Sequence, residues 1–264
     1  MIWWRKKRAG KAPATGPRVE ALPSHIRTVY AIGDVHGCAD LAKRAEARIL
    51  NDSAFCPDST AIVYLGDLVD RGPDTAFLLD FLLSRRNSLP RRYFLCGNHE
   101  EMMLAFFASP RDHLNWLDFG GYETLNSYGI LNRLESLHRM KSRDLESLLA
   151  TSVPQEHLAF LKDMPDALDT SGFFLCHAGV NPALSLAEQT AQDLHWSRNR
   201  FMSHEGGFEK TIVHGHTPVP QPVHADGRVS IDTEAYQTDI LTIARLDMND
   251  QKVEFMMVSK ADDC

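Results

Sequence analysis

The stretch that decides the fold is Ala61-Ile-Val-Tyr-Leu-Gly-Asp-Leu-Val-Asp-Arg-Gly72. Its first five residues are apolar or aromatic and rich in β-formers, which predicts a buried strand. Gly66 ends this run, and two carboxylates and a guanidinium follow it directly. A buried strand with charged side chains at its carboxyl end is typical of the ligand-binding edge of an open α/β sheet.

The same arrangement occurs on both sides of this stretch. Residues 27–33 and 92–96 are two further apolar runs, and they lead into Gly33-Asp-Val-His-Gly37 and Gly97-Asn-His-Glu100. Between the three runs, residues 38–50 and 75–86 carry apolar side chains at helical spacing. The order strand, helix, strand, helix, strand predicts a mostly parallel sheet built from βαβ units.

The second half of the chain differs from the first. We expect residues 100–165 to be a helical cap insertion over one edge of the sheet, with helices at 145–150 and 155–163. Strand-like runs then resume at residues 172–176, 211–213, 229–231, 240–246 and 253–258. Because these late runs are closely spaced and separated by turn signals such as Asp226-Gly227, we expect them to form an antiparallel sheet.

Length and composition predict one α/β domain. The chain has 264 residues, and 44% of them are hydrophobic. We expect residues 25–264 to form the domain and residues 1–24, which are basic and proline-containing, to be a disordered tail. The five cysteines are dispersed, without a CxxC pair, which favours free thiols and a reducing compartment.

Charge and hydropathy exclude several classes of partner. The formal net charge of −7 argues against general nucleic-acid binding, which needs a positive field. No apolar run approaches the ~20 residues that a membrane span requires. The N-terminus lacks the apolar core of a secretory signal, so we expect a cytoplasmic protein. The sequence does not indicate the oligomeric state.

Two more polar clusters follow late strands, Cys176-His-Ala-Gly179 and His214-Gly-His-Thr217. Five clusters at strand ends are expected to converge on one site. The Asp, Asn and His side chains proposed as ligands, with no cysteine among them, suit divalent transition metals. The flanking glycines let the backbone turn sharply beside a ligand.

These motifs carry a family resemblance. GDVHG, GDLVDRG, GNHE, HAG and HGHT resemble the signature of the calcineurin-like metallophosphoesterases. GDLVDRG and GNHE are similar in particular to the PPP-type serine/threonine protein phosphatases, including small bacterial and phage members. The resemblance implies an α/β fold, a metallophosphoesterase-type β-sandwich of two mixed sheets flanked by helices. It also implies a metal-dependent phosphomonoester hydrolase whose substrate is a phosphoprotein or a small phosphoester.

The resemblance assigns the metal ligands. Asp34 and His36 would bind the first cation, Asp67 would bridge both cations, and Asn98, His177 and His216 would complete the second site. We expect Mn²⁺, although Fe and Zn fit the same mixed ligands. A hydroxide that bridges two metals would attack phosphorus in line, without a phosphoenzyme intermediate.

The resemblance also assigns the remaining roles. His99 would be the general acid, and Asp70 would hold its imidazolium. Asn98 and Arg71 would bind phosphate oxygens, for which a planar guanidinium is well suited. For the second phosphate arginine the segment 193–201 offers Arg198, with Arg200 in reserve. His214 is expected at a strand end beside the site rather than in it.

Two features depart from, or add to, the family pattern. Asp232-Thr-Glu-Ala235 resembles an Asp-Thr-Gly segment, but Glu234 stands where glycine is usual. A positive φ at this position would therefore be strained. Within the insertion, residues 119–129 resemble a Gly-Gly, Thr-Leu, Tyr-Gly segment of bacterial members, which is expected to pack beside the entrance of the site.

Two alternative functions remain open at this stage. The first is a symmetrical dinucleoside tetraphosphate hydrolase, although that related family tends to have Ala where Asp70 stands and Asp where Glu100 stands. The second is a metal-dependent binding or scaffold protein that has lost catalysis. Asp70, Arg71 and His99 together count against it, because binding alone needs no general acid.

Overall fold

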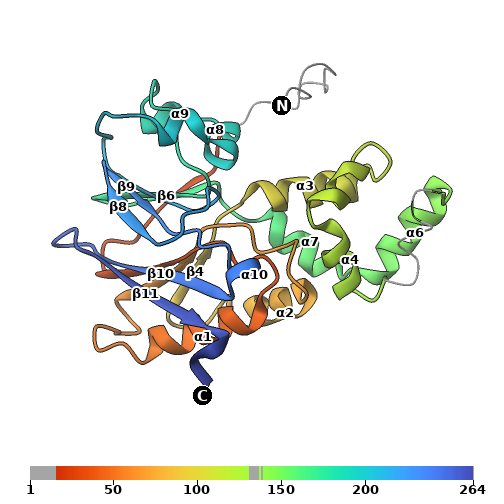
Figure 1. Ribbon diagram of the computed structural model, residues 1–264, viewed down its shortest axis with the longest axis horizontal. Helices are drawn as coiled ribbons and strands as arrows, with labels where there is room; N and C mark the ends of the chain where they lie inside the picture. The colour runs from red at the N-terminus through yellow and green to blue at the C-terminus, as the bar shows by residue number, and fades with distance from the viewer. Residues whose placement is uncertain (1–15, 131–136, 138, 264) are drawn as a thin grey trace.

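The computed structural model describes residues 16–130, 137 and 139–263. Within these residues the strands form two mixed sheets flanked by helices (Figure 1). One sheet has the strand order β1-β5-β6-β7-β9-β8, and the other has the order β11-β10-β2-β3-β4. The strands are β1 Val19–Ala21, β2 Thr28–Ile32, β3 Thr60–Tyr64, β4 Arg91–Phe94, β5 Ala167–Asp169, β6 Phe173–Cys176, β7 Thr211–His214, β8 Val223–Ala225, β9 Arg228–Ser230, β10 Ile240–Asp247 and β11 Val253–Ser259.

The helices cover the outer faces of the sheets and form the inserted region. They are α1 Ala39–Leu50, α2 Thr75–Arg85, α3 Asn98–Ala108, α4 Gly121–Ser127, α6 Ser142–Ser152, α7 Gln155–Lys162, α8 Ala191–Trp196, α9 Asn199–Met202 and α10 Ala235–Thr238. Short 3₁₀ turns lie at Leu114–Phe119, Leu186–Glu188 and Lys260–Asp263. None of the helices in the described ranges is long and apolar enough to cross a membrane.

The predicted βαβ half is confirmed. Strands β2, β3 and β4 pair in parallel, with Val29 opposite Ala61 and Val63 opposite Tyr93. The helices α1 and α2 connect them, as the apolar spacing predicts. Because all three strands run in one direction, the loops after them meet at one edge of the sheet.

The prediction of one late antiparallel sheet is wrong. Strands β6, β7 and β9 pair in parallel, and they belong to a different sheet from β10 and β11. The reason is the length of the connections. The segment between β6 and β7 holds α8 and α9 and is long enough for a crossover, whereas β5–β6, β8–β9 and β10–β11 are joined by short turns and form antiparallel hairpins.

The expected boundary of the N-terminal tail is also wrong. Residues 19–21 form β1, which pairs in parallel with β5, and the Leu22 N–H donates to the Asp169 carbonyl at 2.9 Å. All three residues of this edge strand are exposed, so the sequence has no apolar pattern that would predict it. Backbone hydrogen bonds hold β1 against β5. Residues 1–15 of the expected tail lie outside the described residues.

The packing of the core explains why the central strands are continuous apolar runs in the sequence. Val29 and Ala31 face the other sheet and pack with Phe173 and Val213 between the two sheets. The alternate residues of β2 and β3 face the opposite side and pack against α1 and α2. On the outer face of the first sheet, Phe174 packs against residues of α8 and α9. Both faces of each central strand are therefore buried.

The insertion is helical, as predicted. Helices α3, α4, α6 and α7 project to one side of the sandwich (Figure 1). Helix α6 contains the segment expected at 145–150, and α7 covers the segment expected at 155–163 except its last residue. Trp116 and Phe106 pack in the same core cluster as the outer face of β3. The insertion is thus continuous with the core beside the carboxyl ends of the strands.

Candidate metal centre

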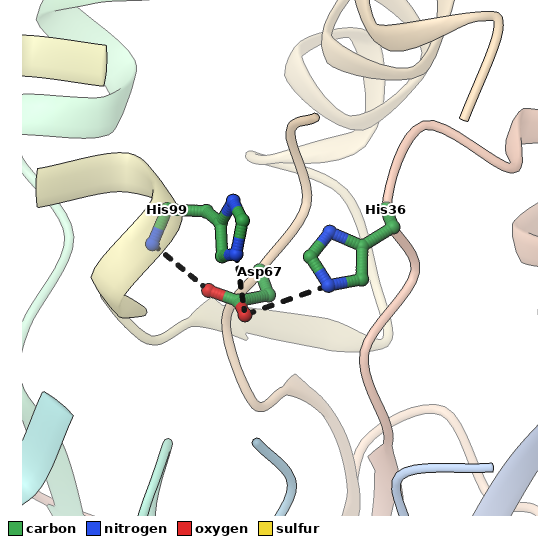
Figure 2. A group of neighbouring side chains, drawn as sticks. All are labelled: His36, Asp67 and His99. Carbon is green, nitrogen blue, oxygen red and sulfur yellow. Dashed lines mark hydrogen bonds and ion pairs between the residues drawn. The ribbon is translucent and has the colours of Figure 1, made fainter. Parts of the chain in front are cut away.

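Asp67 stands at the centre of the converging loops, directly behind β3. Its Oδ2 lies 3.6 Å from His36 Nε2 and 3.9 Å from His99 Nε2, and its Oδ1 accepts a hydrogen bond from the His99 backbone N–H at 3.1 Å (Figure 2). All three residues are buried. The loops after β2, β3 and β4 therefore place one carboxylate between two imidazoles.

The other oxygen of Asp67 faces a second group. His177 Nε2 lies 3.3 Å from Asp67 Oδ1, 2.9 Å from Asn98 Oδ1 and 3.1 Å from His216 Nδ1. These atoms come from the loops after β4, β6 and β7. Asp67 is thus shared between two clusters, and a shared anionic ligand is the arrangement that two neighbouring cations require.

Asp34 supplies the clearest sign of an ion. Its Oδ2 accepts a hydrogen bond from the His216 backbone N–H at 3.0 Å, but its buried Oδ1 has no hydrogen-bond partner in the described part of the chain. Burial, together with the Asp232 and Asp67 carboxylates nearby, raises the pKa of Asp34 well above its usual value. A buried carboxylate oxygen without a donor is costly, and a cation would remove that cost.

The imidazoles are held as ligands. His36 Nδ1 donates to the Val69 carbonyl at 2.8 Å, and His177 Nδ1 donates to the Leu65 carbonyl at 3.0 Å. A carbonyl only accepts, so the proton sits on Nδ1 and the Nε2 lone pair is turned to the site. Burial lowers the pKa of His36 to about 3 and that of His216 to about 2, which keeps both rings neutral. The donor set therefore fits two divalent cations.

Glu100 orders the loops that carry these ligands, a role the sequence did not reveal. Its Oε2 accepts from the backbone N–H groups of Asp67 at 2.9 Å and Gly97 at 2.8 Å. Its Oε1 accepts from those of Leu68 at 2.7 Å and Val69 at 3.2 Å. One buried carboxylate thus ties the loop after β3 to the start of α3. Without it four backbone donors would be buried and unpaired.

His99 and Asp70 form the expected pair. His99 Nδ1 lies 2.7 Å from Asp70 Oδ2. Asp70 also accepts hydrogen bonds from Trp116 Nε1 at 2.7 Å and Thr124 Oγ1 at 2.8 Å. Burial opposes protonation of His99, but the carboxylates of Asp67 and Asp70 outweigh it and raise the pKa of His99 above 6.5. Trp116 and Thr124 were not predicted as site residues, because nothing in the insertion marks them as partners of a carboxylate in a distant loop.

Two arginines reach the centre from different sides. Arg71 places Nη1 3.1 Å from His36 Nε2 and Nη2 3.1 Å from His99 Nε2. Its guanidinium carbon lies 5.0 Å from the centre of the Tyr236 ring. Arg198 donates from Nε to His216 Nε2 at 2.9 Å. Arg200, the alternative to Arg198, is exposed on α9.

His214 and Glu234 lie in motif segments but are not among the proposed ligands. His214 ends β7 and is buried, with Nε2 at 2.8 Å from Ser230 Oγ and Nδ1 at 2.9 Å from the Gly215 carbonyl, so neither nitrogen faces the site. Glu234 keeps the positive φ that glycine would adopt, at 52°. The strain predicted for a positive φ at this position is therefore present.

The comparisons agree with this geometry. A family model described as calcineurin-like phosphoesterase matches residues 27–248. The chain therefore belongs to the calcineurin-like phosphoesterases. Its relatives include a protein named serine/threonine-protein phosphatase 1 from Salmonella typhimurium, which is 30% identical over 234 residues that cover 87% of this chain and 95% of the relative.

Other relatives carry a different activity in their names. A bis(5'-nucleosyl)-tetraphosphatase PrpE [asymmetrical] from Bacillus cereus is 23% identical over 224 residues, covering 77% of this chain and 84% of the relative. Among solved structures, that of a candidate diadenosine tetraphosphatase superposes with a TM-score of 0.62 at 17% identity, covering 93% of this chain and all of the other. This likeness shows the shared fold. The fold is thus the metallophosphoesterase sandwich that the motifs implied.

Proposed function

We propose that this phosphoesterase hydrolyses phosphomonoesters, with phosphoserine and phosphothreonine in proteins as its substrates. The observation that carries the proposal is the His99–Asp70 pair, held at 2.7 Å beside the shared carboxylate Asp67. A histidine in this position can protonate a poorly stabilised alkoxide, which is the leaving group of a serine or threonine ester. The relative named a serine/threonine-protein phosphatase covers most of both chains, which supports the same substrate class.

Two divalent cations, Mn²⁺ in our proposal, fit the donor set. Asp34, His36 and Asp67 would hold one, and Asp67, Asn98, His177 and His216 would hold the other. When bound, such a pair supplies positive charge at the phosphate and acidifies a water molecule. The sharing of Asp67 by both clusters is the structural support for a pair rather than a single ion.

The arginines are proposed to bind the phosphate group. Arg71 approaches on the side of His36 and His99, and Arg198 approaches on the side of His216. Asn98 lies beside His177, with its Oδ1 2.9 Å from His177 Nε2, and its amide NH₂ would be a further donor to phosphate. One guanidinium group binds two phosphate oxygens through two parallel hydrogen bonds. Two arginines on different sides would therefore orient the ester with its leaving oxygen toward His99.

His99 is proposed to give the proton from Nε2 to the leaving oxygen, while Asp70 stabilises the imidazolium through Nδ1. Asp70 remains fixed because Trp116 and Thr124 donate to its two oxygens. Burial opposes protonation of His99, but the carboxylates of Asp67 and Asp70 raise its pKa, which favours the protonated ring that a general acid requires. The substitution His99→Asn removes the acid and preserves a polar side chain of similar reach.

The test is a substrate panel at fixed Mn²⁺ with wild-type protein and His99→Asn. We expect wild-type protein to hydrolyse an aryl phosphate and a phosphoserine peptide. His99→Asn should lose about 10²–10⁴-fold in kcat on the peptide and keep its metal content near that of wild type. Inactivity of metal-loaded wild-type protein on every ester would refute the proposal and leave the binding or scaffold role. An unaffected rate in the variant would remove His99 from the mechanism.

Dinucleoside tetraphosphate hydrolysis is the second candidate, because a relative of similar coverage is named for that activity. The panel includes diadenosine tetraphosphate to separate the two. A hundredfold preference for it over phosphopeptides in kcat/KM would replace our first choice. We favour the protein phosphatase because Asp70 and Glu100 both occupy the positions that resemble that group, and both are integrated into the site.

We also propose that the protein works in the cytoplasm. The described cysteines Cys38, Cys56, Cys96 and Cys176 are all free thiols. Free, dispersed thiols suit a reducing compartment.

A further inference from the structure

His195 is a buried imidazole that the proposed mechanism does not use. It lies in the last turn of α8, and its side chain is 5% exposed. Its Nδ1 is 3.3 Å from Glu101 Oε2, and its Nε2 is 2.8 Å from Asp166 Oδ1. The next residue, Trp196, donates from Nε1 to the same Glu101 oxygen at 2.9 Å. Two consecutive side chains of α8 therefore meet on one carboxylate.

The charge state of this cluster makes it rigid. Burial opposes protonation of His195, but the carboxylates of Asp166 and Glu101 outweigh it and raise the pKa of His195 to about 9. The ring is therefore an imidazolium at neutral pH, with an anion at each nitrogen. A buried cation without its anionic partners is costly, so the charge of His195 favours contact with both Asp166 and the half-exposed Glu101.

Two of the elements that this cluster joins, α3 and α8, lead to the metal centre. Glu101 is on α3, the helix that begins with Asn98 and His99. At the other end, α8 stops at Trp196, and Ser197 alone separates it from Arg198. A further hydrogen bond, from the Ala178 N–H to the Leu194 carbonyl at 2.8 Å, ties α8 to the loop after β6.

Because only Ser197 separates α8 from Arg198, the cluster restricts the backbone next to Arg198. Arg198 has φ −144° and ψ −113°, outside the helical and extended regions; it is exposed, and its Nε donates to His216. Solvent-exposed arginine side chains lose much rotamer entropy when they are ordered. Fixing the backbone immediately before such a side chain lowers that cost, because fewer conformers remain to be frozen when an anion binds.

We propose that Glu101, His195 and Trp196, here called the α8 clamp, are positioning residues that hold the Arg198 guanidinium ready for a phosphate oxygen at the metal centre. The inference rests on the proposed function in one respect, since that function gives Arg198 its role in phosphate binding. It adds that Glu101, a residue outside the five motif clusters, affects phosphate affinity without touching phosphate.

The test is a double-mutant cycle on phosphate binding. Calorimetric titration of inorganic phosphate into Mn²⁺-loaded protein gives Kd for wild type, Glu101→Gln, Arg198→Ala and the double variant. We expect Glu101→Gln to weaken phosphate binding by roughly 3- to 10-fold in the wild-type background and to have no further effect when Arg198 is absent. Glu123→Gln, an exposed glutamate on α4, is the matched control and should bind phosphate as wild type does.

Thermal melting of the same proteins separates positioning from stability. Loss of the Glu101 charge should lower the melting temperature equally with and without Arg198, whereas its effect on phosphate should vanish without Arg198. Trp196→Phe, which deletes the indole N–H and leaves a smaller aromatic ring, serves as the second variant if Glu101→Gln does not fold. Its effect on phosphate binding should likewise vanish when Arg198 is absent. Equal weakening of phosphate binding in both backgrounds would overturn the inference.

Two outcomes distinguish this inference from the proposed function. If Arg198→Ala binds phosphate as tightly as wild type, the inference fails, while hydrolysis of the ester panel by wild-type protein would still support the hydrolase. If wild-type protein hydrolyses no ester but the cycle shows coupling through Arg198, the clamp stands and the hydrolase does not.

Discussion

Replacing Glu100 by Gln tests how the metal-ligand loops are held. Each Glu100 oxygen accepts two backbone N–H groups, from Asp67 and Gly97 on Oε2 and from Leu68 and Val69 on Oε1. Glutamine has the same shape but turns one of these oxygens into an NH₂ group. Whichever way the amide is turned, two backbone donors then face a donor and lose their acceptor.

The magnitude follows from these bonds. A hydrogen bond to a charged acceptor contributes about 1.5–3 kcal/mol, so the loss of two predicts a decrease of about 3–6 kcal/mol in the free energy of unfolding. Glu100 is fully buried, and solvent cannot replace the missing acceptors. For a domain of this size, that decrease corresponds to a fall in Tm of roughly 6–24 °C. It is a large share of the stability of an ordinary domain.

The assay is urea unfolding followed by circular dichroism, in EDTA so that metal binding does not contribute. Glu123→Gln is the control, because Glu123 is exposed on α4, and it should stay within about 0.5 kcal/mol of wild type. A loss below about 1 kcal/mol for Glu100→Gln would refute the reasoning. It would mean that the four N–H groups find other acceptors when the carboxylate is gone.

Three further predictions concern other parts of the site. Tyr236→Ala should weaken phosphate binding roughly fivefold, because the ring that lies 5.0 Å from the Arg71 guanidinium is lost, whereas Tyr236→Phe keeps the ring and should bind as wild type does; calorimetry with inorganic phosphate measures both. Glu234→Gly should raise the free energy of unfolding by about 0.5–1 kcal/mol by relieving the positive φ of 52°, and Glu234→Ala, which keeps a Cβ, should give no such gain in urea unfolding. Ion pairs with Asp166 and Glu101 raise the pKa of His195 from 6.5 to about 9, so the stability that its charge contributes is complete below pH 6.5 and is lost as pH rises through 9. In urea unfolding, the free energy by which wild type exceeds His195→Gln, at most about 3 kcal/mol, should therefore decrease between pH 6.5 and pH 9. A difference that grows with pH would contradict the assignment.

The ligand loops could be predicted from the sequence because their position depends on a simple rule. Asp34, Asp67 and Asn98 each follow an apolar run, and parallel strands bring the ends of such runs to one edge. The rule depends only on recognising apolar strand runs and the helical spacing of apolar residues, and both are clear in residues 28–94. The structure accordingly brings these three residues together with His177 and His216.

The features that could not be predicted depend on contacts between residues far apart in the sequence, which no local pattern indicates. Trp116 and Thr124 donate to Asp70 across 46 and 54 residues of chain, and the sequence places Thr124 in a segment beside the entrance of the site without identifying either residue as a partner of Asp70. Strand β1 is short and exposed, so it carries no periodic signal. The sheet to which each late strand belongs depends on the length and path of its connection rather than on its own residues.

The loop after β3 carries the predicted ligand Asp67 and also depends on contacts with the insertion that the sequence did not predict. Asp67, Asp70 and Arg71 have positive φ values of 48°, 73° and 66°, which residues with a side chain rarely adopt. At about 1–3 kcal/mol each, this strain is comparable with the whole contribution expected of Glu100, so local preference alone would not form the loop. The remaining support comes from the insertion, where Thr124 binds both the backbone N–H and the carboxylate of Asp70, and where the Gly120 carbonyl accepts from the Arg71 N–H at 3.2 Å. The helical insertion is therefore required to form the geometry of the general acid and the phosphate arginine, in addition to any part it takes in admitting substrate.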